Sequence, residues 1–230
     1  RINEGGVGDL TFTFLSSTAI GNGADGVELD ERGEGSVYID VNRGRFLENG
    51  IFDPEDLDDG FDIDEYHEGG ISGSVVNSSA DNNYEEGFDF NENDPDGIAG
   101  SGDLNIVMHS VTANGNLEEG IDLEEDDDFG NGGNLIAVMT KITTNGNAAG
   151  DGGLKIREKE GGNLLVTLSD VKAQDNSTSG VYVRESSGGN SSVTIDKLLS
   201  IENSLHGLEL LESGGGDLTA AVDKAVSIQN

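Results

Sequence analysis

The sequence predicts an all-β chain, folded as a single right-handed parallel β-helix of about eight coils with three short strands per coil. Three observations support this prediction: a six-residue motif that occurs seven times, an asparagine that recurs eight times, and apolar residues at alternate positions between them. Alternation directs one face of each strand inward. A single repeat cannot bury that face, so the repeats must stack into a continuous core.

The six-residue motif is a glycine, an apolar residue, any residue, an apolar residue, any residue and a glutamate. Successive glycines are 34 residues apart from Gly26 to Gly60 and 27 apart from Gly60 to Gly87. We expect the repeated glycine to supply positive φ at the corners of the coil. The motif begins at Gly26, Gly60, Gly87, Gly120, Gly153, Gly180 and Gly207.

A second motif precedes each of these glycines. Alternating apolar residues, such as Leu164, Val166 and Leu168, are followed by a short break, further apolar or small residues and an asparagine. We expect the asparagines to stack at a turn with a left-handed backbone, each amide bonding its neighbour in the next coil. They are Asn22, Asn49, Asn83, Asn116, Asn147, Asn176, Asn203 and Asn230.

The repeats cover residues 1–230 as one solenoid, with coils starting near residues 9, 36, 70, 103, 134, 163, 190 and 217. The array begins and stops within a coil, so we expect the chain to be a segment of a longer protein. Extra residues lengthen the turns at 51–58, 94–101 and 126–131.

The strand that follows an asparagine-bearing turn, as in Asn116 to Ile121, resembles the right-handed parallel β-helix family of pectate lyases and many bacterial surface proteins. The resemblance covers nearly the whole chain and implies the fold rather than a particular activity. A hairpin-based β-sandwich or propeller is the alternative fold.

Charge limits the partners of this chain. The 46 acidic and 12 basic residues give a net charge of −34, which excludes ordinary nucleic-acid binding and opposes contact with anionic membranes. No apolar run reaches transmembrane length, and the absence of cysteine excludes disulfides and thiolate metal sites. Cations are the natural partners. We expect an extracellular or cell-surface location, and high salt, abundant calcium or strong acid would each favour this acidity.

Outward positions on the strand after each motif glycine form two rows along the solenoid. Four adjacent coils carry a carboxylate-rich patch, and the next two coils carry bases. Calcium, which takes oxygen ligands in flexible geometry, would relieve the repulsion. A solvated, salt-screened or protonated acidic face is the alternative. Acidic residues in the turns at 53–59, 94–96 and 126–128 are further candidates. The predicted ligands are Asp62, Asp64, Asp89, Asn91, Asp122 and Glu124.

The glutamate that closes each motif forms a third row. Strand alternation directs it inward, although it lies at the strand end, where the chain bends. Either each carboxylate caps N–H groups of the following turn, or the row is a stack of carboxylic acids with raised pKa values. The second arrangement predicts greater stability at low pH. The row is Glu31, Glu65, Glu92, Glu125, Glu158, Glu185 and Glu212.

We predict a non-catalytic extracellular or cell-surface module, structural or adhesive, that binds a polysaccharide or another surface protein. The change from carboxylates to bases along the rows invites comparison with polysaccharide lyases on this fold, so the alternative is a calcium-dependent polysaccharide lyase acting on uronate-containing polymer. In such lyases, calcium neutralises the uronate carboxylate and Lys or Arg abstracts the neighbouring proton. Lys155, Arg157 or Arg184 would act as base and substrate clamp, although the sequence contains no lyase signature. A simpler interpretation pairs Asp122 with Lys155 and Glu124 with Arg157 across strands.

Overall fold

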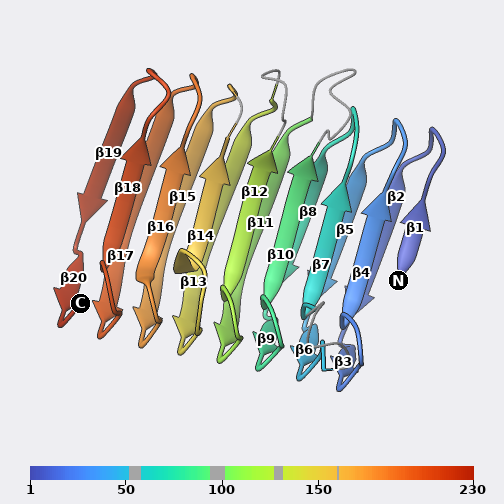
Figure 1. Cartoon of the computed structure of the whole chain (residues 1–230), viewed down its shortest axis with the longest axis horizontal. Coiled ribbons are helices and arrows are strands. Elements are labelled where there is room, and N and C mark those ends of the chain that lie inside the picture. The colour runs from blue at the N-terminus through green and yellow to red at the C-terminus, as the bar shows by residue number, and fades with distance from the viewer. Residues whose placement is uncertain (52–57, 94–101, 127–131, 160) are drawn as a thin grey trace.

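The computed structural model describes residues 1–51, 58–93, 102–126, 132–159 and 161–230. Every regular element in these residues is a β-strand, and the strands stack as a parallel β-helix of about seven turns (Figure 1). The sequence suggested eight coils. The difference arises because the eight asparagines delimit seven full turns.

One sheet, here called sheet A, has eight parallel strands stacked in chain order along the solenoid. Most of them contain the apolar residues and glutamate of the six-residue motif, in matching register from coil to coil. The strands are β1 (Ile2–Glu4), β4 (Val27–Glu31), β7 (Phe61–Glu65), β10 (Phe88–Asn93), β12 (Ile121–Asp126), β14 (Gly152–Glu158), β16 (Ser179–Glu185) and β18 (Leu208–Glu212).

The second sheet, sheet B, has 12 strands. In each coil the chain bends within this sheet at a residue of positive φ. Its main strands are β2 (Leu10–Leu15), β5 (Val37–Asn42), β8 (Ile71–Val76), β11 (Leu104–Asn114), β13 (Leu135–Asn145), β15 (Leu164–Gln174), β17 (Ser191–Ile201) and β19 (Leu218–Asp223). Short strands follow the bend in the other coils: β3 (Thr18–Ile20), β6 (Arg45–Leu47), β9 (Ser79–Asp81) and β20 (Val226–Ile228). In β11, β13, β15 and β17, two of the three predicted strands therefore run on as one.

Two corners in each coil use a residue of positive φ. One lies at the bend of sheet B, as at Ser110, and the other immediately precedes the ladder asparagine, as at Gly115. The expectation that the motif glycines supply positive φ is wrong, because none of the seven has it. Glycine is needed at these positions because neighbouring coils leave no room for a side chain. A Cβ on Gly120 would lie 2.7 Å from Asn147 Nδ2 and 2.8 Å from the carbonyl oxygen of Gly153.

The asparagine ladder is confirmed. Each side-chain amide from Asn22 to Asn203 donates through Nδ2 to Oδ1 of the next asparagine, over 2.8 to 3.1 Å. The same Oδ1 also accepts the preceding asparagine's backbone N–H. The left-handed residue is the one before each asparagine, not the asparagine itself.

A second polar ladder runs along the corner that precedes sheet B, and the sequence reasoning missed it. Asn134 Nδ2 donates to Asp103 Oδ1 at 2.9 Å, and Asn163 Nδ2 donates to Asn134 Oδ1 at 2.9 Å. Asp or Asn at most of the expected coil starts was the available signal. Each main strand of sheet B begins one residue after an expected coil start, whether or not that residue is Asp or Asn.

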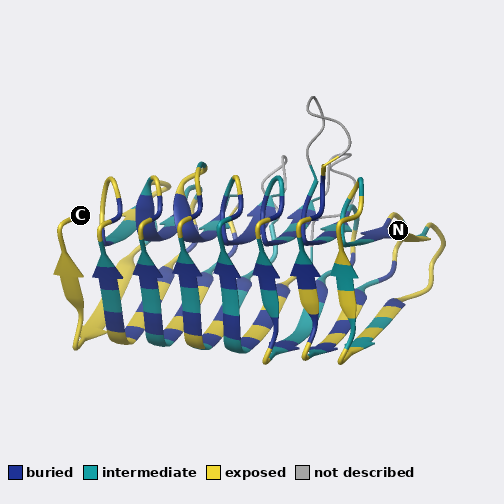
Figure 2. Cartoon of the chain, turned by 90° about the horizontal axis from the view of Figure 1, so that it is seen from below, coloured by how far each residue is buried: buried dark blue, intermediate teal, exposed yellow. Residues whose placement is uncertain are grey.

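The core lies between the two sheets and changes composition along the solenoid. Rings dominate the N-terminal coils, with centroids 5.1 Å apart for Phe46–Phe61 and 5.3 Å for Phe61–Phe90. Leu, Ile, Val and Met replace them further along. Buried and exposed residues alternate along the strands, as the sequence pattern predicted (Figure 2). Consequently the outward rows of sheet A stand on a regularly spaced scaffold.

Candidate functional site

The outward rows of sheet A have the register that the sequence predicted. Asp62 lies opposite Asp89, and Asp89 lies opposite Asp122. Asp64 lies opposite Asn91 in the second row. Neighbouring strands are about 4.8 Å apart, so two ionised carboxylates at this distance repel by about 3.5 kcal/mol at an effective dielectric constant near 20.

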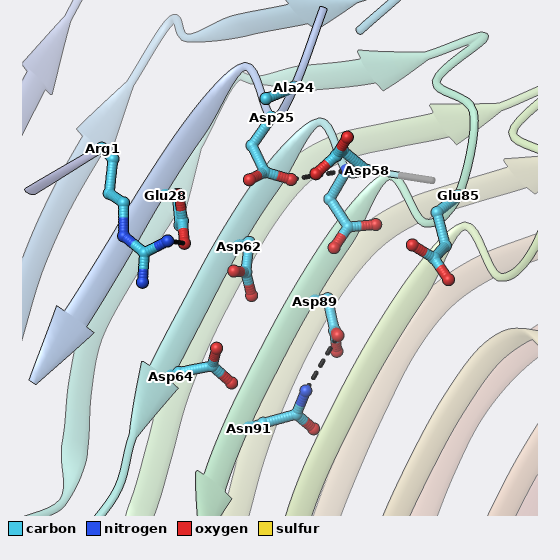
Figure 3. A pocket seen from close by; sticks show the side chains of 11 residues that line it. Arg1, Ala24, Asp25, Glu28, Asp58, Asp62, Asp64, Glu85, Asp89 and Asn91 are labelled. Atoms are coloured by element: carbon cyan, nitrogen blue, oxygen red, sulfur yellow. Dashed lines mark hydrogen bonds and ion pairs between the residues drawn. The ribbon is translucent and has the colours of Figure 1, made fainter. Parts of the chain in front are cut away.

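An open depression of about 450 Å³ lies over strands β4, β7 and β10 on this face (Figure 3). Four of the six predicted ligands line it, namely Asp62, Asp64, Asp89 and Asn91. Carboxylates from the turn before each motif glycine also line it, including Asp25 and Asp59. The depression is thus walled by acidic groups from three consecutive coils.

The turn carboxylates form a row. The sequence named Asp59 as a candidate in its turn but did not predict the row that it forms with Asp25 and Glu86. The Asp59 N–H donates to Asp25 Oδ1 at 2.7 Å, and the Glu86 N–H donates to Asp59 Oδ1 at 2.6 Å. These bonds fix the carboxylates one above another beside the outward row of β7 and β10. The signal was present, since an acidic residue precedes the motif glycine in four successive repeats: Asp25, Asp59, Glu86 and Glu119.

The two rows approach closely enough to share a cation. One ligand oxygen each from Asp25, Glu28 and Asp62 lie within 4.8 Å of one another, and so do oxygens of Asp59, Asp62 and Asp89. Calcium binds oxygens at about 2.3–2.6 Å, so two ligands of one ion can be about 5 Å apart. Both triplets therefore meet the spacing of a calcium site without rearrangement of the backbone.

The protein's own cations contact the acidic face at its two ends. Arg1 lies 3.0 Å from Glu28 and 2.7 Å from Asp30. At the other end, Lys155 Nζ lies 2.6 Å from Asp122. Between these ends, and among the residues that the structure describes, no lysine or arginine forms an ion pair with Asp59, Asp62 or Asp89.

The middle of the face is electrostatically strained as a result. Burial, reinforced by the neighbouring carboxylates, raises the pKa values of Asp59, Asp62 and Asp89 well above their usual range. Asp89 Oδ2 accepts a hydrogen bond from Asn91 Nδ2 at 2.8 Å. Its Oδ1 is buried and has no hydrogen-bond partner among the described residues. Positive charge, brought by a proton or a metal ion, would stabilise this arrangement.

The other two predicted ligands, Asp122 and Glu124, belong to a separate cluster of ion pairs. Asp122 pairs with Lys155, and Glu124 contacts Lys155, Arg157 and Lys159. Burial raises the pKa of Glu124, but hydrogen bonds and ion pairs from Arg157 and the lysines outweigh burial and lower it to about 2. Both expected cross-strand pairs, Asp122–Lys155 and Glu124–Arg157, are present.

The residues considered as lyase bases are held in different ways. Lys155 is buried, and although burial lowers its pKa, its contacts with Asp122, Glu124 and Glu119 raise the value above that of a free lysine. A base must be neutral to accept a proton, so these contacts oppose that role. Arg157 is bound to Glu124 at 2.6 Å. Arg184 lies opposite Arg157, and its Nε is buried without a hydrogen-bond partner in the part of the chain that the structure describes.

Several further acidic candidates fall in turns outside the described residues, among them Asp53, Asp56, Asp94, Asp96 and Asp128. Comparisons with models of protein families, with curated proteins and with solved structures gave no match. The described part of the chain contains no helix with the length and hydrophobicity needed to span a bilayer.

Proposed function

We propose that this chain is a non-catalytic β-helix module of an extracellular or cell-surface protein, and that its acidic face binds calcium. One observation carries the proposal. The row of close carboxylates that includes Asp59, Asp62 and Asp89 contacts arginine and lysine only at its ends, among the described residues. An ion bound in the middle would supply the charge that the side chains lack.

Such an ion would bridge coils rather than residues within one strand. Asp62 lies on β7 and Asp89 on β10, so a shared ion would connect neighbouring turns of the solenoid. A chain without cysteine has no disulfide bonds, and calcium between coils would provide a comparable restraint. Extracellular calcium modules work at dissociation constants of about 0.1–1 mM, which suits an open, solvent-exposed depression.

The adhesive role is part of the same proposal. Calcium held on an acidic face retains open coordination positions, through which carboxylates of an anionic polysaccharide or of another surface protein can bind. This would make the module an adhesin or carbohydrate-binding surface whose affinity for its partner depends on calcium. No contact within the described residues specifically favours the lyase alternative. The ion pairs of Lys155 oppose it, because they favour the charged form of a residue that would have to be neutral to act as a base.

Calcium titration of chelator-treated protein tests the proposal, with thermal unfolding and calorimetry as readouts. We expect the wild-type protein to gain stability with a calcium-specific dependence, by about 2.7 kcal/mol at a hundredfold excess over the dissociation constant. The double variant Asp62→Asn, Asp89→Asn should lose most of that gain. Without calcium it should be more stable than wild type, because mutual repulsion is reduced.

The matched control is Asp40→Asn with Glu34→Gln, which removes the same charge from exposed positions elsewhere on the solenoid. It should retain the full calcium response. A wild-type response equal to that of sodium chloride at the same ionic strength would exclude a specific site. So would an unchanged calcium response in the Asp62, Asp89 variant.

A further inference from the structure

The motif glutamates form a buried row that does not belong to the acidic face. They lie in register on sheet A, and Glu4 extends the row by one coil. Glu158 and Glu185 expose no surface, which is rare for glutamate. This part of the row, on β14, β16 and β18, is also remote in sequence from the proposed calcium ligands.

One oxygen of each carboxylate caps the following turn, as the first sequence interpretation expected. Glu185 Oε1 accepts the N–H groups of Ser187, Gly188 and Gly189, at 2.9 to 3.1 Å. Glu158 Oε1 accepts the Gly162 N–H at 2.8 Å. Capping accounts for the position of the row but uses only one oxygen of each carboxyl group.

The second oxygen faces other carboxyl groups. Glu185 Oε2 and Glu212 Oε2 are buried and accept no hydrogen bond from an N–H or hydroxyl group of the described residues. The groups that act on Glu185 from adjacent elements are Glu158 on β14 and Glu212 on β18, both as hydrogen-bond partners. Glu125 on β12 faces Glu158 from the other side. An ionised carboxylate only accepts hydrogen bonds, so a pair can bond only if one member carries a proton.

We propose that Glu158 and Glu185 are protonated in the folded protein at neutral pH and that the row is a buried proton-binding site. Glu158 donates its proton in a hydrogen bond to Glu185, Glu185 donates to Glu212, and Glu212 remains ionised at the more exposed end. Folding therefore takes two protons from solvent and leaves one negative charge on the three carboxyl groups.

The electrostatic environment agrees with this direction. Burial raises the pKa of Glu158 from 4.5 to about 9 and also raises that of Glu185. Hydrogen bonding from Glu185 and from the turn lowers the pKa of Glu212. A raised pKa in the folded state contributes stability that is complete below the unfolded value of 4.5 and is lost as pH rises towards 9. Each bound proton changes the unfolding equilibrium tenfold per pH unit in this interval.

Denaturant unfolding from pH 5 to 9, with chelator present, tests the proposal on wild type, Glu185→Gln and the control Glu202→Gln. Glutamine keeps the capping oxygen, and its two amide N–H groups can donate to Glu212 and to an ionised Glu158. We expect wild type and Glu202→Gln, which changes an exposed carboxylate, to lose stability in parallel as pH rises. The Glu185→Gln variant should be more stable than both at pH 8.5. Its unfolding equilibrium should change less steeply with pH, by tenfold to a hundredfold less per pH unit, because one or both of the bound protons are no longer taken up.

The infrared carbonyl band of protonated carboxyl groups gives a second readout at pH 7. It should be present in the folded wild type and weaker in Glu185→Gln and in Glu158→Gln. An infrared band that neither substitution changes would overturn the proposal. So would a dependence of stability on pH that is parallel in Glu185→Gln and Glu202→Gln. Because chelator is present throughout, these outcomes do not depend on whether the acidic face binds calcium.

Discussion

At the scale of single residues, buried polar side chains specify the register of this solenoid. Asn116 is fully buried and uses its whole amide: Oδ1 accepts from the backbone and side chain of Asn83, and Nδ2 donates to Asn147 and to the carbonyl of Ala80. A shift of one residue would leave these groups without partners. Spacing alone revealed the asparagines, whereas their complete satisfaction is visible only in three dimensions.

Replacing Asn116 by alanine should therefore destabilise the fold by about 4 kcal/mol, because buried groups in two neighbouring coils lose their partners. The control is Asn114→Ala, two residues away. Asn114 is half-buried, and its side chain donates to Asp81 Oδ1 at 2.7 Å, so losing this bond should cost about 1 kcal/mol. Urea unfolding of both variants measures the difference, and equal losses would argue against a stabilising ladder.

At the scale of the element, glycine serves two separate purposes in each coil. Gly120 begins the motif at a place where neighbouring coils nearly touch. Gly146 has a φ of +69° at the corner before an asparagine, and a Cβ there would meet no atom of the described residues within 4 Å. The sequence pattern marks both as glycine without telling them apart, because crowding depends on the next coil and φ on the local turn.

We expect Gly120→Ala to cost several times as much stability as Gly146→Ala. The first forces a Cβ against the backbone oxygen of Gly153, whereas the second adds only about 1–2 kcal/mol of left-handed strain. Gly146→Asn should be milder still, since asparagine tolerates that conformation. Thermal unfolding of the three variants provides the ranking, and a Gly146→Ala cost above that of Gly120→Ala would reverse the assignment.

At the scale of the whole molecule, each coil contacts chiefly the coils beside it. Leu164 on β15 lies opposite Ser191 on β17, so one repeat separates equivalent positions. Stability in such an array is approximately a sum over repeats and their interfaces. Removing one complete repeat should leave a shorter solenoid with the same core.

Deletion of residues 164–190 joins Asn163 to Ser191, which occupies the place of Leu164. The product should fold cooperatively. The slope of its unfolding free energy against urea concentration should be lower by about one-eighth, because less surface is exposed on unfolding. A deletion of 164–189 is the control, because it shifts the strands by one residue and turns apolar side chains outward. Circular dichroism and urea unfolding distinguish the two, and two equally folded products would contradict register control by alternation.

The sequence by itself determined the repeat, the strand alternation, the asparagine ladder and the outward rows, because each depends on spacing along a regular strand. It also identified Asp122–Lys155 and Glu124–Arg157 as possible pairs, since register places them side by side. Only the tertiary structure decided that Asp25 and Asp59 approach Asp62 and Asp89, and that Glu158 and Glu185 face each other in the interior. Those relations depend on the angle at which each turn rejoins the sheet and on burial from water, and spacing along the chain encodes neither.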